Sequence, residues 1–74
     1  MSVDTWWVRE AKHVYGLQLR HRGQLGEMYR HHGGWRIVPW TMGDWRGTNI
    51  PAMPVKDAKQ IALLLILKAH ENDR

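Results

Sequence analysis

The sequence contains no cysteine, which removes two common ways of stabilising a chain of 74 residues. A disulfide framework and a cysteine-based zinc site are both excluded. The five histidines form no HxxxH or HExxH pattern, so no metal site is expected from them. A chain this short buries only a small core. We therefore expect its aliphatic residues and five tryptophans to form that core, alone or with help from a partner.

Residue patterns typical of catalysis are also missing. The only serine, Ser2, lies at the N-terminus, and there is no cysteine nucleophile. The seven carboxylates show no paired spacing suited to acid–base chemistry. The glycines form neither a P-loop nor a GxGxxG motif before a helix. We expect a protein that is not an enzyme and that needs no cofactor and no small-molecule ligand.

Long apolar runs are missing as well. The longest run, from Ile61 to Leu67, has seven residues, whereas roughly 20 are needed to cross a bilayer. The N-terminal segment MSVDTWW lacks the basic and apolar regions of a signal peptide. The sequence therefore predicts a cytoplasmic protein.

Positive charge is present in excess. The chain carries 11 Lys and Arg against 7 Asp and Glu, a formal net charge of +4. Between Arg9 and Arg46, seven basic side chains oppose three acidic ones, and seven minus three accounts for the whole surplus. Such a field attracts nucleic acid or an acidic protein surface, although a basic solvated face would have the same composition.

Alternating apolar and polar residues predict strands in the first half of the chain. The segment Thr5 to Glu10 is a candidate first strand, and the stretch from Tyr15 to Arg22 alternates with period two. The pair Gly33-Gly34 separates two further runs, 25–32 and 35–38. It predicts a tight turn there, because such a turn needs positive φ at both central residues.

A second two-residue turn at Gly23-Gln24 would give the three strands one apolar face and one basic, polar face. The predicted apolar face holds Leu17, Leu19, Met28, Trp35 and Ile37, with Arg30 as a misfit whose stem reaches an edge. The predicted polar face holds Gln18, Arg20, Arg22, Glu27, Tyr29, His31, Arg36 and Val38.

The second half of the chain reads as a connector and a helix. Glycines and prolines over residues 41–54 predict a long connector, in which Trp45 is expected to cover the core. Residues 55–71 have helical periodicity after Pro54. The expected apolar stripe is Ala58, Ile61, Ala62, Leu65, Ile66 and Ala69. The prediction is a single α+β domain over residues 1–74, a β-β-β-α arrangement. Its three- to four-stranded antiparallel sheet packs on one C-terminal helix, with the first strand as an edge or fourth strand.

Some apolar residues exceed what this arrangement buries. Leu63, Leu64 and Leu67 fall outside the stripe, and Leu63 and Leu67 point nearly opposite to it. Either the connector covers this surface or a partner or second copy does. Trp6 and Trp7 are adjacent in a strand and point to opposite faces, so at most one enters the core. The other lies over the rim of the sheet or anchors a partner, and Trp7 lies on the same side as Arg9.

Two kinds of macromolecular partner fit these features. Arginines around Tyr29 and His31 on a three-stranded sheet suit a DNA groove or an RNA strand. The element order from Tyr15 to Ala69 resembles AP2-type and integrase arm-binding domains, which read DNA with the sheet. The tryptophans, the extra leucines and the basic middle of the chain suit a protein partner equally.

The whole chain, beginning MSVDTWWVREAKHVYGLQLR, is similar in length and N-terminal segment to small host-RNA-polymerase-binding regulators of lytic Xanthomonas phages. This resemblance implies binding near the N-terminus of the largest catalytic subunit of bacterial RNA polymerase. It also implies inhibition of initiation at host promoters, and antitermination. We predict such a transcription regulator, with a nucleic-acid-binding module as the alternative. The residues themselves suggest a contact surface of Val3, Trp6, Trp7, Arg9, Arg20, Arg22, Tyr29, His31 and Arg36, with Leu63 and Leu67 as a second interface.

Overall fold

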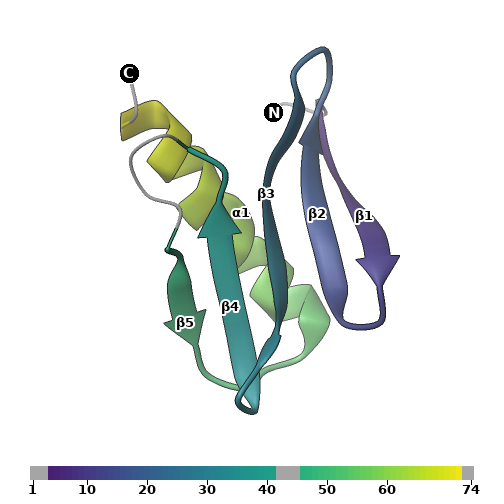
Figure 1. The fold of residues 1–74 in the computed structure, drawn as a ribbon, viewed down its shortest axis with the longest axis vertical. Coiled ribbons are helices and arrows are strands. Elements are labelled where there is room, and N and C mark those ends of the chain that lie inside the picture. Colours follow the sequence, from purple (N-terminus) through teal and green to yellow (C-terminus); the bar gives the residue numbers. More distant parts are fainter. Residues whose placement is uncertain (1–3, 42–45, 73–74) are drawn as a thin grey trace.

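The computed structural model describes residues 4–41 and 46–72 as an antiparallel sheet with one helix across it (Figure 1). The elements are β1 (Thr5–Ala11), β2 (Val14–Leu19), β3 (Gly23–His31), β4 (Gly34–Pro39), β5 (Thr48–Ile50) and α1 (Val55–Asn72). The five strands follow the order β1-β2-β3-β4-β5, so each strand pairs with its neighbours in the sequence. The predicted α+β class is confirmed, but the sheet has five strands where three to four were expected.

The β3–β4 turn lies one residue earlier than predicted. Its central residues are His32 and Gly33, with φ angles of 48° and 80°, and His31 pairs with Gly34. Positive φ at both residues is the geometry of a type I′ turn. The second glycine of the pair has a different role, because a Cβ on Gly34 would collide with the carbonyl oxygen of Ile50 in β5. Gly34 thus lets the fifth strand approach.

The β2–β3 turn also differs from the prediction. Leu19 pairs with Gly23, so Arg20, His21 and Arg22 form the turn. A bulge follows, because Gln18 pairs with Gln24 whereas Leu17 pairs with Gly26. The bulge leaves Leu25 as the extra residue, and its side chain is buried in the core. The placing of Arg20 and Arg22 on a strand face was therefore wrong, since both lie at the tip of a hairpin.

The core lies between α1 and the face of the sheet that was predicted to be apolar. Its buried members are Leu17, Leu25, Met28, Trp35, Ile37, Ala58, Ala62 and Ile66, and Leu19 packs against them. Trp35 is held in place by its indole N–H, which donates to the carbonyl oxygen of Met53 at 2.9 Å. Arg30 pairs with Trp35 at the margin of this face, with its Cζ 5.2 Å from the indole centroid. The prediction that Arg30 lies on the same side as the apolar residues is confirmed, and its side chain is exposed.

Helix α1 begins after Pro54, whose carbonyl oxygen accepts the N–H of Ala58 at 3.0 Å. Its alanines and Ile66 face the sheet, and Gly26 makes room for Ile66, since a Cβ there would lie 3.0 Å from the Ile66 Cδ1 atom. Near its C-terminus, His70 Nε2 lies 2.6 Å from the carbonyl oxygen of Leu25 and donates to it. The helix is thereby fastened to β3 at the bulge.

The rotation of α1 about its axis differs from the prediction. Lys59 reaches β2, with its Nζ 4.6 Å from the Tyr15 ring centroid. On the same flank Leu63 is half-buried against the core, whereas Ile61 is exposed. The expectations that Leu63 points away from the core and that Ile61 enters it were therefore wrong. None of the residues that the structure describes belongs to a helix long and apolar enough to cross a membrane.

The fifth strand lies within the segment predicted to be a plain connector. Trp35, Arg36 and Ile37 pair with Ile50, Asn49 and Thr48 respectively, which adds β5 to the edge of β4. Gly47 precedes the strand with a φ of 85°, and a Cβ on it would lie 2.5 Å from the Ile37 carbonyl oxygen. Trp45, expected to cover the core, lies outside the described residues.

Candidate protein-interaction surface

The candidate surface is the face of the sheet opposite α1, called the open face below. No described element covers it (Figure 1). Residues paired across an antiparallel ladder point to the same side, so the pairing identifies its members. They include Trp6, Val8, Val14, Gly16, Gln18, Gln24, Glu27, Tyr29, His31, Arg36, Val38 and Asn49.

The two N-terminal tryptophans lie on opposite sides of the edge strand β1. Trp6 is on the open face and 47% exposed, with Val8 beside it at 39%. Trp7 is half-buried against the core, on the same side as Arg9. The prediction that at most one indole enters the core is confirmed. Val3 lies outside the described residues.

Two carboxylates lie at the centre of the open face. Gly16 pairs with Val8 on one side and with Glu27 on the other. A bulge in β1 leaves Glu10 without a partner in β2, and its carboxyl carbon lies 3.0 Å from where a Gly16 Cβ would be. We call Glu10, Gly16 and Glu27 the acidic centre. Burial, and secondarily the charge of Glu10, raises the pKa of Glu27.

A pair of glutamines closes the acidic centre towards one end of the face. Gln18 Nε2 donates to Gln24 Oε1 at 3.3 Å, and Gln24 Nε2 donates to the Gly26 carbonyl oxygen at 3.1 Å. Trp6 pairs with Gln18 across β1 and β2. The indole, the amides and the carboxylates therefore lie in adjacent rows of one surface.

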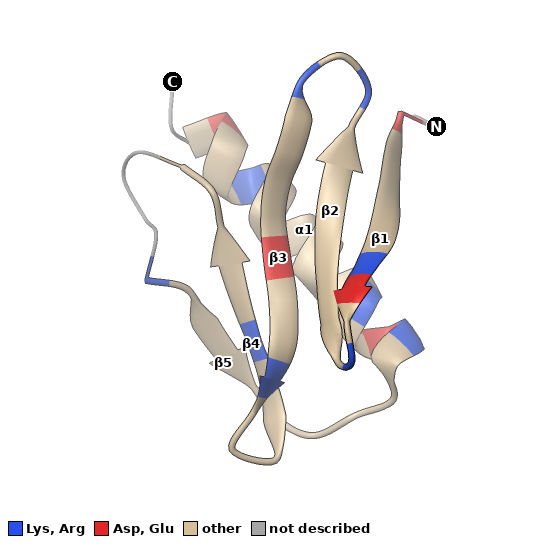
Figure 2. Cartoon of the chain, turned by 45° about the vertical axis from the view of Figure 1, so that its right-hand side comes forward, with Lys and Arg blue, Asp and Glu red and all other residues tan. Residues whose placement is uncertain are grey.

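Basic residues surround this surface and do not occupy its centre. In Figure 2 the Lys and Arg segments of the sheet lie at turns and towards strand ends, others lie on α1, and an acidic segment crosses the middle of β3. Arg20 and Arg22 form the turn next to Trp6, because the N–H of Arg20 donates to the Asp4 carbonyl oxygen at 2.9 Å. Arg36 lies near the opposite end, beside the β3–β4 turn. The predicted basic face is thus an apolar and acidic face with basic ends.

The guanidinium of Arg36 is held by hydrogen bonds to β5, a strand that was not predicted from the sequence, and to the residue that precedes Gly47. Its Nη1 donates to Asn49 Oδ1 at 2.9 Å, and its Nη2 donates to the Arg46 carbonyl oxygen. Two rings follow along β3, since the His31 ring centroid lies 6.0 Å from that of Tyr29 and 4.2 Å from that of His32. Partial loss of hydration, then the neighbouring His32 and Arg36, lowers the pKa of His31.

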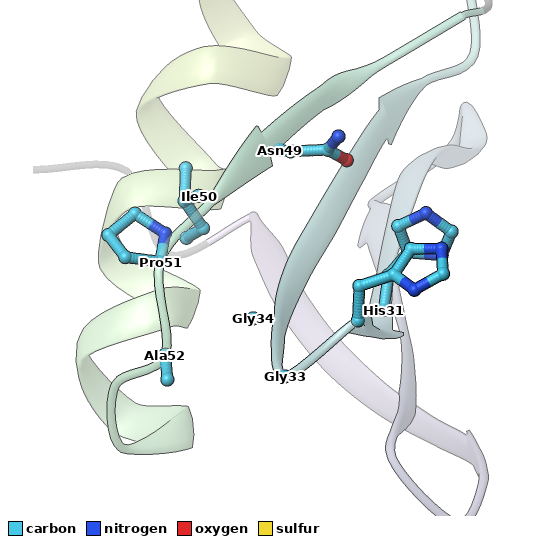
Figure 3. Close-up of a pocket in the computed structure, with 8 residues that line it drawn as sticks. His31, Gly33, Gly34, Asn49, Ile50, Pro51 and Ala52 are labelled. Carbon is cyan, nitrogen blue, oxygen red and sulfur yellow. The ribbon is translucent and has the colours of Figure 1, made fainter.

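A cavity of about 350 Å³ lies between the β3–β4 turn and the chain that leaves β5. Imidazole rings and the Asn49 amide stand on one side of it, and an apolar stretch stands on the other (Figure 3). Its lining is His31, His32, Gly33, Gly34, Asn49, Ile50, Pro51 and Ala52, a set with two imidazoles and no carboxylate, hydroxyl or thiol. The described residues contain no group of three His, Asp or Glu that could hold a metal ion.

Three apolar side chains are exposed on α1, on the other side of the molecule. Leu64 is 70% exposed, and Ile61 and Leu67 are exposed to a smaller extent. Of the predicted second interface, Leu67 belongs to this exposed strip and Leu63 does not. The sequence placed Leu64 outside the core-facing stripe, as the structure does, but the predicted second interface did not include it. The rotation of the helix is set by the contacts of Lys59 and Ile66 with the sheet.

Comparisons with protein-family models, with curated proteins and with solved structures find no match to this chain.

Proposed function

We propose that this protein is a transcription regulator that binds bacterial RNA polymerase through the open face and β1. The observation that carries the proposal is the exposure of Trp6 and Val8 on an edge strand of an uncovered sheet face. Grouped apolar side chains left exposed by a small fold mark interaction sites. Tryptophan is also among the residues that most often dominate binding energy at protein interfaces.

The choice of partner rests on the N-terminal segment MSVDTWWVREAKHVYGLQLR and its similarity to polymerase-binding regulators of lytic Xanthomonas phages. We accordingly propose the N-terminal region of the largest polymerase subunit as the binding site. Binding there, in the host cytoplasm, would inhibit initiation at host promoters and favour antitermination. The basic ends of the open face support an acidic partner surface, since charges at a rim steer association.

The charge pattern favours protein over nucleic acid. A phosphate backbone lying along the open face would meet Glu10 and Glu27 at its centre, where like charges repel. Nucleic-acid-binding faces place cations where the phosphates run. Here Arg20 and Arg22 are confined to a turn at one end.

The proposal is tested with a tagged chain incubated in a bacterial lysate with and without nuclease. RNA polymerase should stay bound after nuclease treatment, and purified polymerase should bind the chain directly. Trp6→Ala should weaken this binding by about tenfold or more. Leu64→Ala removes a more exposed apolar side chain from α1 and should bind as the wild type does.

A transcription assay on purified components extends the test. The wild-type chain should reduce initiation at a host promoter and increase read-through at a terminator, and Trp6→Ala should do both less well. Loss of polymerase on nuclease treatment, together with tight binding to duplex DNA, would overturn the proposal in favour of a nucleic-acid-binding module.

A further inference from the structure

The open face combines an acidic centre, apolar flanks and basic ends, and this pattern specifies the chemistry of its partner. We propose that the acidic centre receives one Lys or Arg side chain of the partner protein, at the middle of an otherwise apolar and acidic partner surface. This inference rests on the proposed function and adds the feature by which the partner is recognised.

The geometry suits a long cationic side chain. Gly16 has no side chain, and the side chains of Glu10 and Gln24 lie over its backbone, within 3.0 Å of where a Cβ would be. Val8 and Val38 flank the acidic centre in the same row across the sheet, since Val8 pairs with Gly16 and Val38 pairs with Glu27. The methylene stem of a Lys or Arg would pack on these valines while its charge meets the carboxylates.

The electrostatics also favour a cation. Glu27 is half-buried and close enough to Glu10 for the two negative charges to repel. A cation placed between them removes that repulsion and gives the Glu27 carboxylate a favourable interaction in place of the hydration that burial removes. An arginine would satisfy both oxygens of a carboxylate at once, which makes the contact selective as well as favourable.

The same pattern disfavours the other occupants of this face. A second copy docked face to face would bring two acidic centres towards each other about a two-fold axis. Nucleic acid would place phosphates there. In a partner with one central cation and acidic residues around it, the cation matches the acidic centre and the acidic residues match the basic ends of the open face.

The test compares three forms of the full chain for binding to purified RNA polymerase at fixed ionic strength. The double variant Glu10→Gln with Glu27→Gln keeps the shape of the acidic centre and removes its charge. We expect it to bind about tenfold or more weakly than the wild type. The control Glu71→Gln removes one negative charge from the exposed end of α1 and should leave affinity unchanged.

The outcomes separate the two proposals. A wild-type chain that fails to bind polymerase overturns the proposed function and this inference with it. If the wild type binds and the double variant binds equally well or more tightly, the inference alone is overturned. Labelled duplex DNA and sedimentation of the chain by itself complete the test. If the double variant keeps its affinity for polymerase and binds DNA more tightly, the open face would be assigned to nucleic acid. If it keeps that affinity and self-associates more strongly, the open face would be assigned to a second copy of the chain.

Discussion

At the scale of single residues, Glu27 shows what strand alternation reveals and what it leaves out. Alternation places it correctly on the face away from the core. It does not show that Gly16 and the bulge in β1 bring Glu10 alongside, because the bulge depends on pairing between strands. The raised pKa of Glu27 follows from that packing, so neither composition nor alternation in the sequence could predict it.

The pH dependence of stability tests this environment. The folded pKa of Glu27 lies above the ordinary value of 4.5, so the folded chain binds this proton more tightly than the unfolded chain does. The contribution of Glu27 to the free energy of unfolding is therefore most favourable below pH 4.5. It is lost as pH rises from there through the raised folded pKa.

Glu27→Gln should remove this part of the pH dependence and should be more stable than the wild type at neutral pH. Urea unfolding at a series of pH values from about 4 to 7.5 measures both effects. Glu71→Gln is the matched control, and its stability should run parallel to the wild-type curve. A neutral-pH loss of stability in Glu27→Gln would contradict the environment described for this side chain.

At the scale of elements, the sequence predicted faces better than pairings. A two-residue turn at Gly33-Gly34 would pair Arg30 with Ile37. With the turn one residue earlier, Arg30 pairs with Trp35, a shift of two positions. Side chains alternate with period two, so an even shift leaves each of them on its predicted face. The core members Met28 and Trp35 were therefore predicted correctly from a register that was wrong.

Short elements and helix rotation could not be predicted in the same way. The strand β5 has three residues, too few for alternation to be visible. It forms because β4 presents a free edge and because Gly34 and Gly47 allow two backbones to approach closely. The helix bounds were predicted to within one residue, since periodicity over 18 residues is a strong signal.

The close approach at Gly34 predicts a selective loss of stability. Gly34→Ala places a Cβ against the Ile50 carbonyl oxygen, so β5 must shift away from β4. We expect a cost of about 1–3 kcal/mol in the free energy of unfolding, measured by urea or thermal denaturation. Gly33→Asn is the control, because a side chain at Gly33 meets no atom within 4 Å and Asn tolerates positive φ. Equal effects of the two substitutions would show that the turn, and not the packing of β5, requires this glycine.

At the scale of the whole molecule, the net charge of +4 predicted the sign of a partner but not the place of contact. Alternation in the sequence placed Arg20 and Glu27 on one polar face. The structure separates them, because Arg20 belongs to a turn and Glu27 to the middle of a strand. Under the proposed function, charge at the ends would bring the partner close and charge at the centre would recognise it.

This separation predicts different kinetics for the two regions. Arg20→Glu with Arg22→Glu changes the formal net charge from +4 to 0 by removing two positive charges and adding two negative ones. At low salt the association rate with RNA polymerase should fall by about tenfold, with little change in the dissociation rate. Raising the salt concentration should reduce the difference from the wild type. Surface-immobilised polymerase and a series of ionic strengths give both rates.

The matched control makes the same change of charge on the helix, with Lys56→Glu and Lys68→Glu. Both lysines are exposed on α1, across the molecule from the open face. If only the net charge governs association, the two double variants will associate equally slowly. If the basic turn beside Trp6 steers the partner onto the open face, the helix variant will associate faster than the turn variant. A turn variant that instead dissociates faster would place Arg20 and Arg22 inside the contact, where their loss breaks bonds and does not merely weaken steering.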